Sequence, residues 1–355
     1  MGRTGEKPVR FRKSMARILL TGFVPFGEHI ENVSELIVNQ IPSNFSISDP
    51  WDTVRQESTV ESIPVEIEKQ ILSVDEDGSK SIASRLINGH RWDAIIHLGL
   101  SAKSTQIKLE TKARNLLDMA IPDNSGREVR QNFLGERDID CSNKYVNHLL
   151  YPEISDFEFS NDAGSYVCNE TYYRTLSTLN DLQLNEEIPC FFLHIPIKEL
   201  VTVDFAIDKI SEVISRLFFK PVIDVVGALF LQDKKMLLAR KNSKDSLCGK
   251  WEFPGGKIEP NEDGENAIVR EIMEEFGWAI RVKNKFGSWF YEYELISIVL
   301  HIFAVDFVSE VPNLMIKDDW TSHDLADWFD NSKGLNLLGA DAEVAREVER
   351  FVKSM

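Results

Sequence analysis

Three glutamates crowd one short stretch of the chain, Glu271, Glu274 and Glu275. Residues three and four apart share a helix face, so these side chains should line one side of about one helical turn. Like charges at this spacing repel one another by roughly a few tenths of a kcal/mol per exposed pair. A divalent cation reverses that interaction, because Mg²⁺ prefers carboxylate oxygens and is usually completed by water and substrate phosphates. The spacing therefore predicts a metal-dependent site that cleaves pyrophosphate, and a solvated acidic helix face is the alternative.

The surrounding residues favour the metal site, because they fill a longer pattern. Its fixed positions are occupied by Gly256, Glu262, Arg270, Glu271, Ile272, Glu274, Glu275, Gly277 and Trp278. This stretch resembles the Nudix box. The resemblance implies that water attacks phosphorus in a nucleoside diphosphate linked to another group. Mg²⁺ or Mn²⁺ would be held by the three glutamates, with the backbone at Gly256 close to the metal.

The same resemblance assigns roles to the neighbouring charges. Arg270 would orient a carboxylate through a bidentate pair, and Glu262 would complete the metal shell. The general base stays open: Glu262 is one candidate. Four residues farther along the chain are the others, namely Asp318, Asp319, His323 and Asp324.

Two segments flanking the box are similar to the MutT-type branch, which acts on nucleoside triphosphates. They are GKWEFPGGKIE at residues 249–259 and LLGADAEVARE at residues 337–347. The resemblance makes Asp341 the residue that reads the base and Arg240 a substrate contact. The alternative for Asp341 is a helix N-cap for residues 342–352, and both roles are compatible.

A second set of reactive side chains lies in the first half of the chain. Cys168 stands in AGSYVCNETYY, where an apolar strand end is expected to meet a helix start. Free N–H groups and the helix dipole at such a position favour thiolate over thiol. His194 ends the apolar run CFFLHIP. Taken singly, each has a structural alternative, a packed small residue for the cysteine and a hydrogen-bonded core ring for the histidine.

Together with TGFVPFG at residues 21–27, these motifs resemble pyroglutamyl peptidase I, the C15 family of cysteine peptidases, over residues 16–219. The segment IKLETKARNLLDMAIPDNSG aligns Glu110 with the catalytic glutamate of that family. The resemblance implies that Cys168 attacks the amide carbonyl and His194 moves the proton. Glu110 would hold the imidazole in orientation.

The resemblance also implies a substrate pocket for the pyroglutamyl ring. Phe23 and Phe26 would line it, and three further residues would contact the substrate, Asn32, Tyr166 and Val167. The chain departs from the family pattern at residues 102–104 and at Ile197, around the pocket and not in the triad. Two alternatives follow: this half acts on a different cyclic amide, or it is a ligand-binding module that regulates the other half.

Strands alternating with helices must position these groups. Buried apolar runs predict strands at residues 17–26, 93–100 and 189–196, and helical spacing predicts helices at 32–41, 71–87 and 203–218. This order predicts an α/β fold, a three-layer α/β/α sandwich with a mixed, largely parallel sheet.

At residues 219–221 the pattern restarts with a hairpin, 222–232 and 236–241. We therefore expect three parts: a basic, disordered leader at 1–15, the C15-like domain at 16–219, and a Nudix α/β/α sandwich at 220–355.

The composition of the chain limits the kinds of molecule that we expect it to bind. The net charge of −17 disfavours nucleic acid polymers. No apolar run reaches the ~18 residues that span a bilayer, so we expect no membrane partner and a cytoplasmic location. Four scattered cysteines argue against a disulfide framework or a zinc site. The expected ligands are a nucleoside triphosphate with Mg²⁺ or Mn²⁺ and a pyroglutamyl peptide or related amide, and the C15 resemblance implies a homo-oligomer formed through the N-terminal domain.

Overall fold

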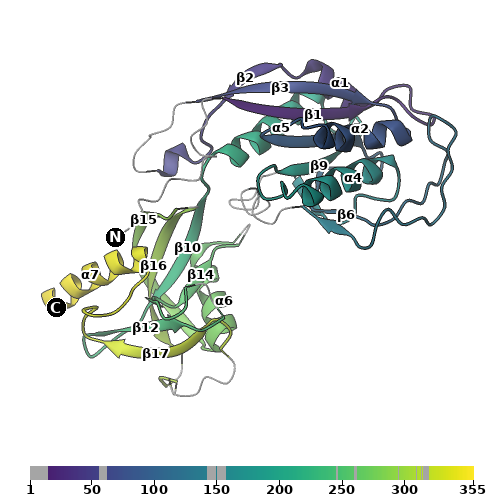
Figure 1. Cartoon of the computed structure of the whole chain (residues 1–355). Helices are drawn as coiled ribbons and strands as arrows, with labels where there is room; N and C mark the ends of the chain where they lie inside the picture. Colours follow the sequence, from purple (N-terminus) through teal and green to yellow (C-terminus); the bar gives the residue numbers. More distant parts are fainter. Residues whose placement is uncertain are drawn as a thin grey trace. The chain divides into compact units, whose positions relative to one another are not determined.

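The computed structural model describes most of the chain. The described residues are 15–55, 62–141, 149, 157–244, 247–259, 262–294, 296–308, 310–312, 314 and 320–355. The chain divides into two compact units, one of Met1–Asp52 with Ser58–Phe219 and one of Thr53–Glu57 with Lys220–Met355 (Figure 1). The expected leader, 1–15, lies outside the described residues except for its last position.

A seven-stranded sheet forms the centre of the first unit, in the order β2-β3-β1-β4-β9-β5-β8. Only the β2–β3 and β5–β9 pairs are antiparallel, so the predicted mixed, largely parallel sheet is confirmed. The strands are β1 (Ala16–Phe23), β2 (Asn44–Ile47), β3 (Ile63–Leu72), β4 (Ala94–Leu100), β5 (Ile107–Glu110), β8 (Phe157–Ser160) and β9 (Cys190–Ile195). A separate small ladder joins β6 (Lys112–Ala113) to β7 (Ile139–Asp140).

Helices cover both faces of this sheet, which is why its central strands are apolar on both sides. The helices are α1 (Val33–Gln40), α2 (Glu76–Ile87), α4 (Val167–Asp181) and α5 (Val203–Phe218), with a 3₁₀ turn, η2, at Asp52–Val54. Helix α1 packs with α5, and α2 packs with α4 (Figure 1). Asp75 starts α2 by accepting a hydrogen bond from the N–H of Gly78. Residues 71 and 72, which were expected in this helix, belong to β3 instead.

The strand expected just before Cys168 is not formed. Strand β8 ends at Ser160, and the segment from there to Tyr166 is irregular. The backbone N–H of Asp118 donates to the carbonyl of Ser165 at 2.8 Å, so this segment is bonded to a loop and not paired along a strand. The prediction of a strand was wrong because apolar residues alone do not separate a strand from a packed loop.

The described residues of the second unit form two four-stranded sheets and two helices. One sheet has the order β14-β10-β16-β15, and the other joins β11, β12, β13 and β17. The strands are β10 (Val222–Leu229), β11 (Leu231–Gln232), β12 (Lys235–Lys241), β13 (Trp251–Glu252), β14 (Gly255–Lys257), β15 (Ile280–Glu292), β16 (Ser297–Phe307) and β17 (His323–Phe329). The helices are α6 (Gly264–Phe276) and α7 (Gly339–Ser354).

The predicted hairpin is only partly correct. Strands β11 and β12 pair across a tight turn at Asp233 and Lys234, both with positive φ. The expected long first strand breaks after Leu229, however, because β10 pairs with β14 and β16 in the other sheet. The hairpin therefore links the two sheets.

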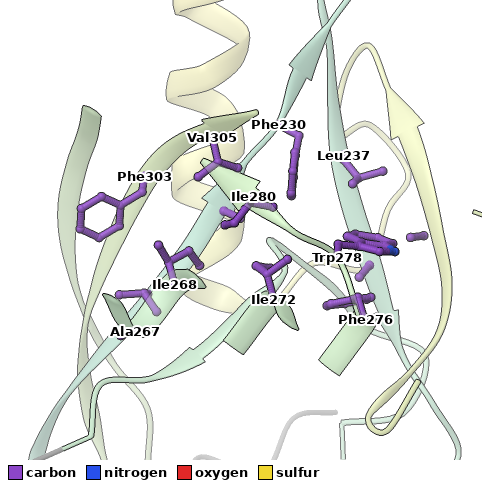
Figure 2. Close-up of a cluster of buried hydrophobic side chains, with 14 residues drawn as sticks. Phe230, Leu237, Ala267, Ile268, Ile272, Phe276, Trp278, Ile280, Phe303 and Val305 are labelled. Carbon is purple, nitrogen blue, oxygen red and sulfur yellow. The ribbon is translucent and has the colours of Figure 1, made fainter. Parts of the chain in front are cut away.

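Two apolar cores lie on opposite sides of β16, because its side chains alternate. Phe303 and Val305 pack with Ile268 and Ile272 of α6 in one core (Figure 2). Residues of the other parity, such as Ile302, pack with α7 in the second core. The α/β/α layering predicted for this half of the chain is confirmed.

In the described residues, no helix is both long enough and apolar enough to cross a bilayer.

Candidate functional sites

The first site begins at the start of α4. Tyr166 is the N-cap of this helix, and Cys168 is its second residue. The sulfur lies close to β4, because a Cβ added to Gly99 would come within 3.0 Å of Sγ. Gly99 pairs in register with His194 on β9. The fold thus brings Cys168 and His194 to neighbouring positions from distant parts of the sequence.

Glu110 completes this group. Its Oε1 lies 2.8 Å from Nδ1 of His194, across the antiparallel pair of β5 and β9. The residue is 1% exposed, and its other oxygen, Oε2, has no hydrogen-bond partner in the described residues. A nucleophile, an imidazole and a carboxylate bonded to that imidazole form the arrangement that acyl transfer requires.

The charge state of Cys168 differs from the expectation. Burial raises the pKa of this thiol to about 12, and the nearby Glu110 carboxylate adds to the rise. The bond from its own backbone N–H lowers the pKa, as the helix start predicts, but by less. The prediction that the helix start favours thiolate was therefore wrong for this state, because desolvation of the sulfur outweighs the helix terminus.

The residues predicted for the substrate pocket fall into two groups. The rings of Phe26 and Tyr166 lie 5.8 Å apart, centre to centre, and the Tyr166 hydroxyl donates to the carbonyl of Pro122 at 3.0 Å. Both rings are only partly buried, so they form an accessible aromatic pair next to the N-terminus of α4.

The other three predicted pocket residues have structural contacts. Phe23 is 2% exposed and packs on Phe192 with a ring separation of 6.4 Å, and Val167 is fully buried. Asn32 caps α1 by accepting from Ser34, and its amide donates to the carbonyl of Val24. Phe23, Asn32 and Val167 are therefore buried, whereas the rings of Phe26 and Tyr166 remain accessible.

A buried ion-pair network supports this site, and the sequence analysis missed it. Glu170, two residues after Cys168, is fully buried and pairs with Arg127 at 2.7 Å and with Arg174 at 2.7 Å. Arg127 also pairs with Asp123 at 2.8 Å, which fixes the loop beside Tyr166 to α4. The four-residue spacing of Asp123 and Arg127 was visible in the sequence, but their buried partner on another element was not.

The second site lies on α6. Asp263 caps this helix, and its apolar stripe packs into the core, leaving the glutamates beside that stripe. A Cβ on Gly256 of β14 would lie only 2.3 Å from Glu271 Oε2. The glycine therefore makes room for the Glu271 carboxylate, and the structure brings these two predicted residues together.

Arg270 links the acidic residues to one another. It donates two hydrogen bonds to Glu262, at 2.9 and 2.8 Å, which is the predicted bidentate pair. It also donates to Glu271 at 2.9 Å and to Glu274 at 3.1 Å. The Arg270 guanidinium lowers the pKa of Glu262. A carboxylate so stabilised is a weak base, which counts against Glu262 as the general base in this arrangement.

Glu275 points toward the interior, unlike Glu274. It accepts a hydrogen bond from Ser322, and burial raises its pKa. Its Oε2 is buried and receives no hydrogen bond from a described residue, although His323 Nδ1 lies 3.4 Å away. A buried carboxylate oxygen left open in this way is a suitable ligand for a cation.

His323, one of the base candidates, is part of a buried polar chain. Its Nε2 lies 2.7 Å from Glu252, which also pairs with Lys241 at 2.7 Å. The sequence analysis missed Glu252 and Lys241, since Glu252 stands between two aromatic residues in a strand. Asp324 instead pairs with Arg240 at 2.8 Å, and Asp318 and Asp319 lie outside the described residues.

The carboxylate oxygens suit a hard divalent cation, but those of the three glutamates do not meet at one common position. Among the described residues, no group of three acidic, histidine or cysteine side chains is placed to hold a metal ion. Glu271 and Glu274 are bonded to Arg270 and Glu275 to Ser322. The open Oε2 of Glu275 and the close packing of Glu271 on Gly256 match the expected donor set.

Asp341 is buried and accepts the backbone N–H of Phe253 at 2.8 Å. Burial raises the pKa of Asp341 to about 8, and the charge of Glu252 adds to this effect. The alternative role as an N-cap was wrong: α7 begins at Gly339, Leu338 is the N-cap, and Asp341 lies in the first turn. Arg240 stacks over Trp251, 5.8 Å from its ring centre.

Comparison with known proteins identifies both halves. Residues 16–216 match the family model "Pyroglutamyl peptidase", and residues 221–349 match the model "NUDIX domain". The chain belongs to the pyroglutamyl peptidase family, since that match covers more than half of it. It also carries a NUDIX domain at its C-terminus, and this combination identifies a hydrolase.

Parts of the chain are similar to individual known proteins. A pyrrolidone-carboxylate peptidase of Deinococcus radiodurans is 26% identical over 203 residues, 55% of this chain and 84% of the relative. A CTP pyrophosphohydrolase of Escherichia coli is 37% identical over 83 residues, 23% of this chain and 60% of the relative. The crystal structure of a pyrrolidone carboxyl peptidase from Fervidobacterium islandicum is 24% identical, covers 57% of this chain and 98% of its own, and has a TM-score of 0.45.

Proposed function

We propose that the chain carries two hydrolytic activities: a cysteine peptidase that removes N-terminal pyroglutamate, and a metal-dependent hydrolase of nucleoside triphosphates. The observation that carries the first activity is the 2.8 Å bond between His194 and Glu110 beside Cys168. For the second it is the packing of Glu271 on Gly256 within a complete Nudix box.

The peptidase reaction starts from a neutral thiol, because burial raises the pKa of Cys168 to about 12. His194 takes the thiol proton as the sulfur attacks the carbonyl carbon, and Glu110 stabilises the imidazolium that results. The amide C–N bond then breaks, and His194 returns the proton to the leaving nitrogen. Water hydrolyses the thioester, which releases pyroglutamate and restores the thiol.

Release of a fluorophore from a pyroglutamyl amide tests this activity. Cys168→Ala should abolish the release, and Cys141→Ala is the matched control, because Cys141 is a buried cysteine outside the proposed group. Absence of turnover with folded wild-type protein would refute the peptidase proposal.

In the nucleotide reaction, this chain's residues would hold the cation that neutralises the polyphosphate. Mg²⁺ or Mn²⁺, when bound, supplies positive charge to the phosphate oxygens and to the attacking water. Glu271, Glu274 and Glu275 would be its ligands, with the backbone of Gly256 beside them. Arg270 would release Glu271 and Glu274 while keeping its bidentate grip on Glu262.

Asp341 and Arg240 remain the proposed contacts to the nucleobase of the substrate. The pKa of Asp341 is raised, so its carboxyl is protonated in a fraction of the molecules near neutral pH. In those molecules the carboxyl can donate as well as accept a hydrogen bond. The similarity to a CTP pyrophosphohydrolase makes CTP the first nucleotide to examine.

A screen of nucleoside triphosphates with Mg²⁺, including CTP and modified bases, tests this half. Glu275→Gln should lose activity and bind Mn²⁺ more weakly, whereas the exposed Glu265→Gln on the same helix should keep both. If wild type and Glu275→Gln hydrolyse the same nucleotide equally fast, the assignment of the glutamates fails.

A further inference from the structure

The peptidase domain contains a cavity of about 290 Å³ that the reaction described above does not use. Its lining includes apolar residues that are buried or half-buried, among them Leu36 of α1, Leu100 of β4 and Ile197. The cavity therefore has an apolar wall built from α1 and from the ends of two sheet strands.

This cavity lies at the same end of the sheet as the reacting group. Leu100 follows Gly99, which adjoins the sulfur of Cys168, and Ile197 comes three residues after His194. Neighbouring strand residues point to opposite faces of a sheet, so Gly99 faces α4 and Leu100 faces α1. His29 lines the cavity, and its ring lies 5.5 Å, centre to centre, from that of Phe26, so the cavity adjoins the aromatic pair of Phe26 and Tyr166.

The aromatic pair and the cavity differ in charge. The aromatic pair suits an uncharged lactam ring, whereas the cavity carries exposed carboxylates at Glu28, Glu31 and Glu199. Glu31 pairs with Lys198. Within the described part of the chain, no ion pair engages Glu28 or Glu199, which leaves a net negative rim.

We infer that this cavity binds the residue that follows pyroglutamate, and that it selects a cationic side chain, arginine or lysine, at that position. This inference rests on the proposed peptidase function. The aliphatic stem of such a side chain packs on Leu36 and Ile197 while its charged end reaches Glu28 and Glu199. A glutamate at the same position meets like charge and is rejected.

The test compares three substrates that differ only after pyroglutamate: the dipeptide amides with arginine, alanine and glutamate. The wild type should show a kcat/KM for arginine on the order of tenfold above that for glutamate, since each exposed ion pair contributes a few-fold. The ratio should fall as salt is added, because the carboxylates are exposed. Glu28→Gln combined with Glu199→Gln should reduce it to about twofold or less. Glu187→Gln, an exposed glutamate outside the cavity, is the control and should keep the ratio.

Cleavage of a neutral pyroglutamyl fluorophore distinguishes failure of the peptidase proposal from failure of the proposed charge selection. If that substrate is not cleaved, the peptidase proposal itself is wrong. If it is cleaved but arginine and glutamate substrates are processed equally, the cavity does not select charge. A preference for arginine that survives in the double variant would also overturn the inference, because the selecting groups would then lie elsewhere.

Discussion

Replacing Gly256 by alanine should displace one predicted metal ligand without unfolding the domain. The new Cβ would lie 2.3 Å from Glu271 Oε2, whereas ordinary contacts begin at 3.4 Å, so the carboxylate must retreat by about 1 Å. Gly256 is not among the glycines with positive φ, so alanine is compatible with its backbone. A misplacement of about 1 Å in a reacting group costs on the order of 100-fold in rate.

The assay has two parts. Titration with Mn²⁺ followed by electron paramagnetic resonance should show affinity weakened by about 10- to 100-fold, a loss comparable to that from removing a supporting metal contact. Nucleotide turnover should fall by on the order of 100-fold, while the melting temperature changes little. Metal affinity distinguishes a displaced ligand from a general loss of activity.

Gly255→Ala provides the matched comparison. Its Cβ would lie 2.0 Å from the backbone oxygen of Val226, the neighbour in β10, so the strands themselves must separate. This variant should lose stability, by about 1–3 kcal/mol. If Gly256→Ala binds Mn²⁺ and hydrolyses nucleotide like the wild type, Glu271 does not act where the structure places it. If Gly256→Ala loses as much stability as Gly255→Ala, the steric reasoning is refuted.

Three further predictions concern buried titratable groups. Glu110→Gln should lower kcat for the pyroglutamyl amide by about 10⁴-fold while changing KM little, because the amide fixes the wrong imidazole tautomer; an unchanged kcat would remove Glu110 from the mechanism. His97 is fully buried, and burial lowers its pKa from 6.5 to about 3. The unfolded state then binds the extra proton between these values, so unfolding free energy should fall by about 1.4 kcal/mol per unit as pH drops below 6.5; His97→Gln should flatten this slope in acid denaturation. For Asp341 the pKa is raised, so the folded state holds the extra proton and stability falls as pH rises from about 4 toward 8. Asp341→Asn should therefore raise the melting temperature at pH 8 more than at pH 5, and an equal change at both would contradict the raised pKa.

The sequence predicts much of the fold because strands and helices alternate with clear periodicity. Strands β1, β4 and β9 and helix α5 were all anticipated. Two local errors have a common cause. The segment before Cys168 is hydrogen-bonded to a loop, and the expected long strand after Val222 changes sheets, so in both cases tertiary partners decide the backbone pairing.

The candidate sites were predictable in residue type but not in electrostatics. The family resemblances implied that Glu110, Cys168 and His194 act together, and that Gly256 and Glu271 share a site. They could not show that desolvation would raise the pKa of Cys168 or that Arg270 would bind three carboxylates at once. Such effects depend on burial and on partners from distant elements, which a single sequence does not display.

The position of β9 has a consequence for protein synthesis. This strand lies between β4 and β5, although both precede it in the chain by many residues. The middle of the sheet therefore cannot form until residues 190–195 have been synthesised. Pairing of strands that are so far apart in the sequence is slow. His194 arrives with that last central strand, so the hydrogen bond between His194 and Glu110 cannot form in a nascent chain until β9 has been synthesised.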